Sequence, residues 1–211
     1  MSEAQVKPAT PSWRLISTLG VAGAMAGLLI VLVFGWAEPR ILDNQARAIA
    51  AAIDEVLHDP ARTETLFLVD GALTTTPPAG TDTLKVDRVW AGYDDDGRRV
   101  GFAMLAAEPG FQDLVHVIFG FDAESGTVLG MRVLDNKETP GLGDKIVKDS
   151  AWVAGFEGAA APLVAVKPGT GTGADNEVDT ITGATISSRV VIQIIDNRIA
   201  QVRPLLPRGA Q

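Results

Sequence analysis

Asp179-Thr180-Ile181-Thr182-Gly183-Ala184-Thr185 leads directly into an apolar run near the end of the chain. Gly183 gives the backbone the freedom to turn at this point. Apolar residues then recur at spacings of three, four and five, as one buried face of a helix requires. They are Ile186, Val190, Val191, Ile194, Ile195 and Ile199. We therefore expect a helix that begins near Thr185.

The hydroxyl of Thr185 would lie at the start of that helix. Backbone N–H groups without helical partners surround this position, and the helix dipole is positive there. Both favour a phosphate that is attached to the hydroxyl or rests against it. An ordinary helix cap is the alternative, because Thr and Asp are common N-cap residues.

The spacing Asp-x-x-Thr-Gly-Ala-Thr resembles the Asp-x-x-(Ser/Thr)-Gly-Ala-Thr signature of the FMN-binding domain family. The RnfG (RsxG) and NqrC subunits of ion-pumping membrane oxidoreductases share this domain. In the family the last threonine carries FMN through a phosphoester, so the resemblance implies covalent FMN on Thr185. Thr182 stands where many relatives have Ser, and both residues supply a hydroxyl.

Thr185 has no strong base beside it in the sequence, and a threonine hydroxyl is a weak nucleophile. Self-modification is therefore not expected. The resemblance implies a separate flavin transferase that uses FAD and a divalent metal. Asp179 would be part of what that enzyme recognises, although a role in capping the turn fits the sequence equally well.

A second motif lies upstream at Lys137-Glu138-Thr139-Pro140-Gly141-Leu142-Gly143-Asp144-Lys145 and contains the family's Glu-Thr-Pro-Gly-Leu-Gly loop residue for residue. Pro140 fixes its own φ and restrains Thr139. Gly141 and Gly143 allow positive φ and let backbone amides approach a flat ring. A tight turn between a strand and a helix is the alternative. Together the two motifs imply flavin contacts from Glu138, Thr139, Pro140, Gly141, Leu142, Gly143, Asp179, Thr182, Gly183 and Ala184.

Four more side chains are candidates for tuning or holding the cofactor. Lys137 and Lys145 flank the loop and would stabilise a negatively charged reduced flavin if they pointed inward. Exposed, solvated lysines are the alternative. Ser187 and Ser188 fall in the first turn of the last helix, where hydroxyls and backbone amides could hold the flavin phosphate.

The N-terminal part predicts a membrane anchor. Leu15 to Ala37 is a run of 23 residues without a charge, long enough at about 1.5 Å per residue to cross a hydrocarbon core of roughly 30 Å. Trp13 and Trp36 stand at its two ends as interfacial anchors. Lys7 and Arg14 lie on the N-terminal side, which favours a cytoplasmic N-terminus.

A cleaved signal peptide is the alternative, because Gly35-Trp36-Ala37 has small residues at the cleavage spacing. The apolar run exceeds the usual signal-peptide core of about 7 to 15 residues, which favours retention. A stalk helix is expected next, with Leu42, Ala46, Ile49, Ile53 and Val56 on one face. The expected organisation is a cytoplasmic tail (1–14), a transmembrane helix (15–37), a stalk helix (38–60), an extracytoplasmic FMN-binding domain (61–203) and a flexible tail (204–211).

The remaining chain predicts a single α+β head with a mainly antiparallel sheet and packed helices. β-Branched and aromatic residues cluster in four predicted strands, at 85–91, 100–107, 114–121 and 128–134. Asp96-Gly97 and Ser125-Gly126 mark hairpin turns between neighbouring strands. A short helix over 145–156, an Ala/Pro/Gly-rich connection over 158–174 and the last helix complete the head.

Composition excludes several kinds of site. The chain has no cysteine, so cysteine-ligated iron-sulfur clusters, disulfides and thiol-linked haem are excluded, and redox work needs a bound organic cofactor. His58 and His116 lie far apart without a ligand pattern around them, and no metal site or catalytic residue is predicted. Asp94-Asp95-Asp96-Gly97 suits a solvated hairpin tip and lacks the ligand spacing of an EF-hand. Residues 38–211 hold 25 acidic and 16 basic residues, which disfavours nucleic acid as a partner.

The resemblance extends over nearly the whole chain and implies an RnfG-type electron-transfer subunit, with NqrC as the nearest sibling. Such a subunit carries covalent FMN on the outer side of the bacterial cytoplasmic (inner) membrane. Its complex couples electron transfer between ferredoxin and NAD to ion translocation. The implied partners are integral membrane and redox subunits, a flavin transferase and membrane lipid. An NqrC-like subunit, a stand-alone extracytoplasmic flavin electron carrier and a flavin-free membrane adaptor are the alternatives.

Overall fold

The computed structural model describes residues 11–77, 80 and 86–207. Lys7 of the N-terminal charge pattern, Lys85 of the first predicted strand and the end of the predicted tail lie outside the described residues. The chain divides into two compact units between Arg47 and Ala48.

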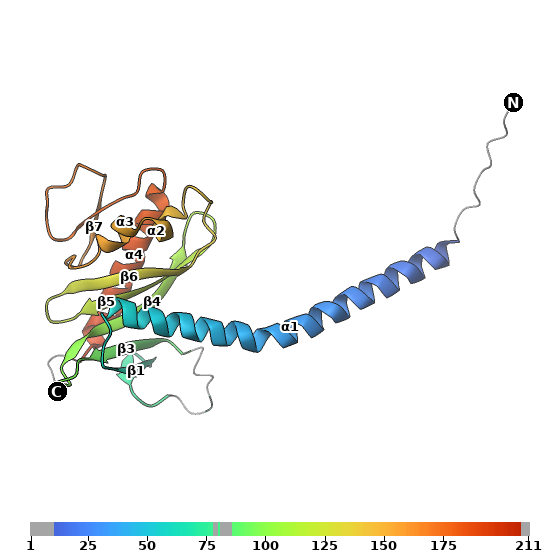
Figure 1. Cartoon of the computed structure of the whole chain (residues 1–211), viewed down its shortest axis with the longest axis horizontal. Coiled ribbons are helices and arrows are strands. Elements are labelled where there is room, and N and C mark those ends of the chain that lie inside the picture. Colours follow the sequence, from blue (N-terminus) through green and yellow to red (C-terminus); the bar gives the residue numbers. More distant parts are fainter. Residues whose placement is uncertain (1–10, 78–79, 81–85, 208–211) are drawn as a thin grey trace. The chain divides into compact units, whose positions relative to one another are not determined.

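A single helix, α1 (Ser12–Val56), takes the place of the two predicted N-terminal helices (Figure 1). In the first unit its large apolar side chains are exposed, and the helix is long and apolar enough to cross a membrane. Leu42 and Ala46 are also exposed, so the face predicted for the stalk is buried only in its last part. Ile53 and Val56 form that buried part and belong to the second unit.

A six-stranded antiparallel sheet forms the centre of the second unit, and it confirms the predicted α+β class. The strands follow the order β2-β1-β3-β4-β5-β6. Their bounds are β1 (Arg62–Val69), β2 (Ala72–Thr74), β3 (Arg88–Tyr93), β4 (Arg99–Pro109), β5 (Leu114–Asp122) and β6 (Thr127–Asp135). The four predicted strands correspond to β3 to β6, whereas β1 and β2 were not predicted. Gly97 and Gly126 have positive φ in the two predicted hairpin turns.

The segment after the sheet differs from the prediction in two places. The helix predicted over 145–156 is two short helices, α2 (Lys145–Lys148) and α3 (Ser150–Ala154). Asp149 separates them with a ψ of 89°, and its side chain accepts a hydrogen bond from the N–H of Trp152. The predicted connection over 158–174 contains β7 (Val164–Val166), which pairs in parallel with β8 (Glu177–Asp179). The last helix, α4 (Thr185–Val202), begins where the sequence predicted and is followed by the short 3-10 helix η1 (Arg203–Leu205).

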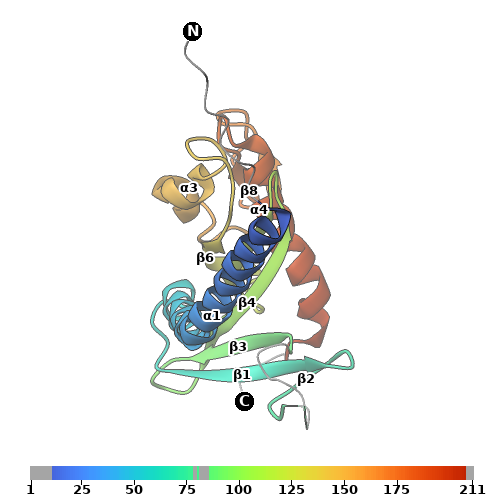
Figure 2. The ribbon, with the colours of Figure 1, turned by 90° about the vertical axis from the view of Figure 1, so that its right-hand side faces the viewer.

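The sheet is covered on both faces, as Figure 2 shows for α4 and the last turns of α1. Strand alternation separates the two cores, because successive side chains point to opposite faces. The α4 face holds the larger core, which includes Val117 and Phe119 of β5. The other face holds Ile118, which packs with Ile53 and Val56 of α1. Gly120 lets α1 come close, since a Cβ at this position would overlap the carbonyl oxygen of Val56.

Candidate functional site

The two sequence motifs meet at one end of the second unit and enclose a cleft of about 330 Å³. Three segments form its walls: the tip of the β4–β5 hairpin, the loop between β6 and α2, and the first turn of α4. The lining residues are Phe111, Glu138, Thr139, Leu142, Gly143, Gly183, Ala184, Thr185, Ile186 and Ser187. Eight of these belong to the predicted site residues, so the fold brings most of the candidates together.

Thr185 is the first residue of α4, and its half-buried side chain lines the cleft. The turn before it depends on Gly183, whose φ of 85° favours glycine. Ala184 occupies the N-cap position, and no side chain among the described residues caps this helix end. The capping alternative for Asp179 and Thr185 is therefore wrong in this structure. The first N–H groups of α4 have no preceding helical turn to bond and remain available to a ligand.

The hydroxyl of Thr185 has one described partner, the carbonyl oxygen of Ile181 at 3.3 Å. This bond is long and uses the hydroxyl as a donor. No described group is placed as a base for the hydroxyl proton, since the partner is a neutral carbonyl. Within the described residues, no group donates a hydrogen bond to the Thr185 hydroxyl oxygen.

Asp179 and Thr182 face a different hollow from the one that Thr185 faces. Asp179 ends β8, and its carbonyl oxygen accepts a hydrogen bond from the indole N–H of Trp152 at 2.6 Å. Both residues are exposed and line a larger hollow of about 740 Å³ beside α3 and the β7–β8 connection. The motif Asp179 to Thr185 therefore lies between two hollows. Residues 179–182 line the larger hollow, and residues 183–185 line the cleft.

Glu138 is a buried polar side chain of the cleft, with only 5% of its surface exposed. Its Oε1 accepts hydrogen bonds from the backbone N–H groups of Phe111 at 2.8 Å and Gln112 at 3.2 Å. Its Oε2 accepts a hydrogen bond from the hydroxyl of Ser187 at 2.8 Å. One carboxylate thus contacts the hairpin tip and the start of α4 from the loop between them.

Pro140 and Gly141 belong to the same loop but do not line the cleft. Gly141 has a φ of 78°, and its N–H donates to Oδ1 of Asp144 at 2.7 Å. A hydrogen bond from Lys148 to Asp144 holds the pKa of that carboxyl below its usual range. Leu142 projects at the mouth of the cleft with 52% of its surface exposed.

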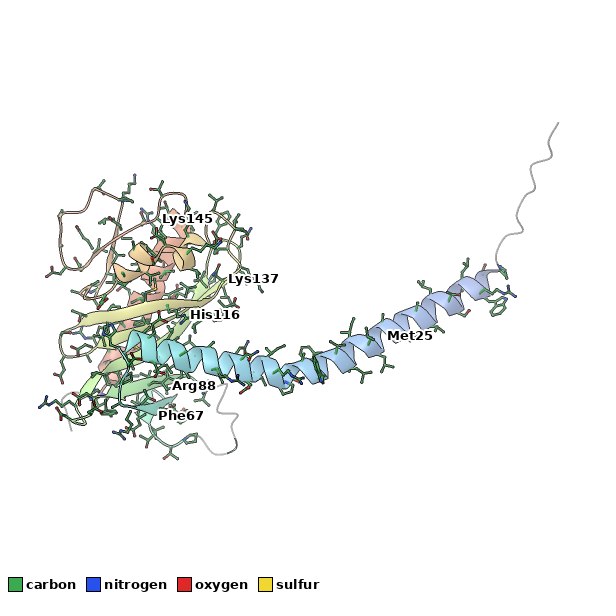
Figure 3. All side chains as sticks on the ribbon, in the orientation of Figure 1. Met25, Phe67, Arg88, His116, Lys137 and Lys145 are labelled. Atoms are coloured by element: carbon green, nitrogen blue, oxygen red, sulfur yellow. The ribbon has the colours of Figure 1, made fainter. Side chains whose placement is uncertain are left out.

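The two lysines that flank the loop have different partners. Lys137 forms an exposed ion pair with Asp113 at 2.8 Å, and this hydrogen bond lowers the pKa of Asp113 and raises the pKa of Lys137. The exposed alternative is therefore confirmed for Lys137. Nζ of Lys145 donates to the carbonyl oxygen of Thr182 at 3.1 Å. Figure 3 labels Lys137 after the end of β6 and Lys145 at the start of α2.

The serines of the first helical turn are buried, and their hydroxyls already have partners. Ser187 donates to Glu138, whereas Ser188 donates to the carbonyl oxygen of Ala184 at 2.9 Å. The Ser188 oxygen also accepts the N–H of Ile181 at 3.2 Å. A ligand at this helix start would therefore meet backbone N–H groups rather than these two hydroxyls.

Two apolar cleft residues differ from the sequence-based expectations. Ile186 was predicted for the buried face of the last helix, but 57% of its surface is exposed and it lines the cleft. Phe111 was not singled out, although it stands at the hairpin tip with 63% exposed. The available signal was an aromatic residue next to Gly110, where a polar turn residue is usual.

The other polar candidates lie away from the cleft. Asp94 stands at the predicted hairpin tip, where its Oδ1 accepts the N–H of Arg98 at 2.8 Å. Nε2 of His58 lies 3.7 Å from Glu157, and His116 is half-buried on β5. These positions give neither histidine a place in the site.

The residues of the cleft fit a ligand with a flat apolar ring and an anionic phosphate. Phe111, Leu142 and Ile186 offer exposed apolar surface at its mouth. The hydroxyl of Thr185 and the uncapped start of α4 offer a phosphate position. The cleft volume of about 330 Å³ lies at the lower end of the range of roughly 300 to 1,000 Å³ for small-ligand sites.

Comparison with known proteins agrees with this geometry. Residues 110–200 match the family model of the FMN-binding domain. The chain is 31% identical to the RnfG subunit of the ion-translocating oxidoreductase complex of Shewanella loihica, covering 87% of this chain and 86% of the relative. It is 33% identical to the same subunit of Vibrio parahaemolyticus, covering 88% and 86%. The crystal structure of Shewanella oneidensis NqrC has the same fold, with a TM-score of 0.59 and 18% identity over 77% of this chain and 95% of that one.

Proposed function

Because the chain belongs to the RnfG family of ion-translocating oxidoreductase complexes, we propose that it carries FMN covalently attached to Thr185. One observation carries the proposal. The hydroxyl of Thr185 lies at an uncapped helix start and faces a cleft that both family motifs build. The protein is accordingly an FMN-binding electron-transfer subunit, and a bound FMN supplies reversible electron uptake that the amino acids themselves cannot provide.

The cleft residues hold the flavin in two ways. Backbone N–H groups in the first turn of α4 bind the phosphate next to Thr185. Phe111, Leu142 and Ile186 would cover the apolar part of the ring, beside the backbone of Gly143 and Gly183. Glu138 and Thr139 complete the wall between these groups.

Attachment requires an enzyme, because the only described partner of the Thr185 hydroxyl is a carbonyl oxygen. We infer a flavin transferase that uses FAD and a divalent metal. Thr185 Oγ1 forms a bond to the phosphorus of the FMN part of FAD, the phosphoanhydride bond breaks, and AMP leaves with the hydroxyl proton. Asp179 and Thr182 face the larger hollow beside α3, where the enzyme can recognise them while Thr185 enters the reaction.

The apolar part of α1 anchors the subunit in the bacterial inner membrane among lipid and the other subunits of its complex. Trp13 and Trp36 mark the two ends of the span, and Lys7 and Arg14 support an N-terminus on the cytoplasmic side. The head then lies on the outer side, and the complex couples ferredoxin:NAD electron transfer to ion translocation. The proposed organisation is a tail (1–14), a span (15–37), a stalk (38–60), an FMN-binding domain (61–203) and a C-terminal tail (204–211).

The decisive experiment is co-expression of the full chain with an active flavin transferase. Flavin fluorescence on a denaturing gel and intact mass are measured for the parent, Thr185→Val and Thr63→Val. Thr63→Val is the matched control, since it removes an exposed threonine hydroxyl from β1, outside both motifs. We expect one FMN adduct in the parent and in Thr63→Val, and none in Thr185→Val.

A parent without adduct, beside a transferase that loads another substrate, would contradict the proposal and favour the flavin-free adaptor. Co-purification of the loaded subunit with integral membrane subunits distinguishes the complex from a stand-alone flavoprotein. Isolation without such subunits from a gentle extract would contradict the placement in an ion-translocating complex.

A further inference from the structure

Glu138 connects three parts of the chain that are far apart in sequence. It stands in the β6–α2 loop and accepts hydrogen bonds from the hairpin tip at Phe111 and Gln112 and from Ser187 of α4. All three distances lie between 2.8 and 3.2 Å. These three segments are also the walls of the cleft. This one carboxylate therefore contacts every wall of the cleft.

The surrounding backbone is shaped to admit the carboxylate. A Cβ on Gly110 would overlap Oε1 of Glu138, and a Cβ on Gly143 would lie 2.8 Å from the Glu138 Cβ and 3.0 Å from Oγ of Ser187. Neither glycine has a positive φ. Close approach to Glu138, rather than backbone conformation, explains why glycine stands at both positions.

The hydrogen bonds also define what Glu138 does not do. Both carboxylate oxygens are occupied by protein donors, and only 5% of the residue is exposed. Its three partners all donate, which suits a carboxylate that keeps its negative charge. Glu138 was expected to contact the flavin; the geometry favours an action through the segments that it holds.

We propose that Glu138 is the positioning residue of the cleft, and that its buried negative charge lowers the reduction potential of the flavin bound there. Removing the carboxylate frees the hairpin tip from the start of α4, because no residue other than Glu138 bonds both in the described parts of the chain. A fixed negative charge in the cleft wall opposes the uptake of electrons by a neighbouring ring. The effect on the reduction potential rests on the proposed function, whereas the positioning role does not.

Two substitutions separate position from charge. Glu138→Gln keeps an oxygen for the N–H groups of Phe111 and Gln112 and gains an amide that can donate to Ser187, so it keeps the geometry without the charge. Glu138→Ala removes both. Glu157→Gln is the control, because it removes one negative charge from an exposed side chain outside the cleft.

The first measurement is amide hydrogen exchange of the full chain in detergent, without flavin. We expect exchange at Phe111 and Gln112 to accelerate about tenfold or more in Glu138→Ala, because hydrogen bonds to a charged group are lost. It should stay within about threefold of the parent in Glu138→Gln and Glu157→Gln. Unchanged exchange in Glu138→Ala overturns the positioning role.

The second measurement is a potentiometric titration of the flavin-loaded chains. We expect a more positive flavin potential in Glu138→Gln than in the parent, with the visible circular dichroism of the flavin retained, and no change in Glu157→Gln. Equal potentials in Glu138→Gln and Glu157→Gln overturn the charge effect. A parent that takes up no flavin overturns this part together with the proposed function, while the exchange data still decide the positioning role.

Discussion

Lys145 links α2 to the turn that precedes Thr185, since its Nζ donates a hydrogen bond to the carbonyl oxygen of Thr182 at 3.1 Å. Gly183 follows Thr182 directly, and Nζ of Lys145 would lie 3.4 Å from a Cβ placed on this glycine. Lys145, at the end of the upstream motif, therefore holds the turn that leads into Thr185.

Lys145→Met should slow FMN attachment to Thr185 without abolishing it. One hydrogen bond is worth about 0.5 to 1.5 kcal/mol, so a two- to tenfold slower attachment is expected. The rate is followed by flavin fluorescence on denaturing gels after the transferase is added. Lys148→Met is the control, because Lys148 lies on the same helix and pairs with Asp144. Equal rates in the two variants would show that the contact with Thr182 does not guide attachment.

Phe111→Ala should expose the bound flavin without destabilising the protein. The side chain is 63% exposed at the cleft mouth, so the stability change should stay within about 0.5 kcal/mol. Flavin fluorescence in the loaded protein should become brighter and more easily quenched by iodide, because an aromatic cover is lost. Phe111→Leu should fall between the parent and Phe111→Ala. Quenching equal to that of the parent in Phe111→Ala would place the ring elsewhere.

Gly120→Ala should destabilise the head, because its Cβ would overlap the carbonyl oxygen of Val56. Overpacking of this kind costs about 1 to 3 kcal/mol. Gly130→Ala is the matched control on the neighbouring strand, where the nearest atom to the new Cβ is Cα of Val56 at 3.7 Å. Denaturant unfolding of the full chain measures both. A Gly120→Ala midpoint as high as that of Gly130→Ala would contradict the close approach of α1.

Asp196→Asn should stabilise the protein at neutral pH. Burial raises the pKa of Asp196 above its ordinary value of 3.8, and its Oδ1 accepts the N–H of Leu163 at 2.8 Å, which an amide oxygen can also do. Below pH 3.8 both folded and unfolded states bind the proton, so the carboxyl costs nothing. The loss in the free energy of unfolding that the ionised carboxyl causes grows as pH rises through the pKa of the folded state, and it is complete above that pKa. Thermal unfolding as a function of pH should show a higher Tm for Asp196→Asn than for the parent at neutral pH, and the difference should vanish in acid. A Tm difference that is the same at all pH values would contradict a raised pKa of Asp196.

The sequence predicted the parts of the head in which local pattern and packing agree. β3 to β6 have clustered β-branched and aromatic residues, and Gly97 and Gly126 lie in two of the turns between them. The start of α4 at Thr185 followed from the glycine and the apolar spacing. β1 and β2 escaped prediction because Arg62 to Val69 carries mixed polar and apolar residues with mostly partial burial. Its strand form comes from pairing with β3, which no local pattern reveals.

The candidate site was predictable in its motifs but not in its contacts. Two motifs about 40 residues apart in the chain were expected to share one ligand, and the cleft brings them together. Asp179 faces the larger hollow beside α3 because β8 pairs with β7, and the sequence did not indicate this pairing. Ile186 fitted the helical spacing but is exposed and lines the cleft rather than the core.

The end of α1 decides where the head could be released by a protease. Ala52, Ile53 and Val56 are buried against the sheet, while Arg40 and Arg47 are exposed in the first unit. Cleavage after either arginine would free a soluble fragment with its second core complete. Cleavage after Glu55 would strip α1 from the Ile118 face and leave that surface open to aggregation. The final turns of the anchor helix are thus an integral part of the domain that it carries.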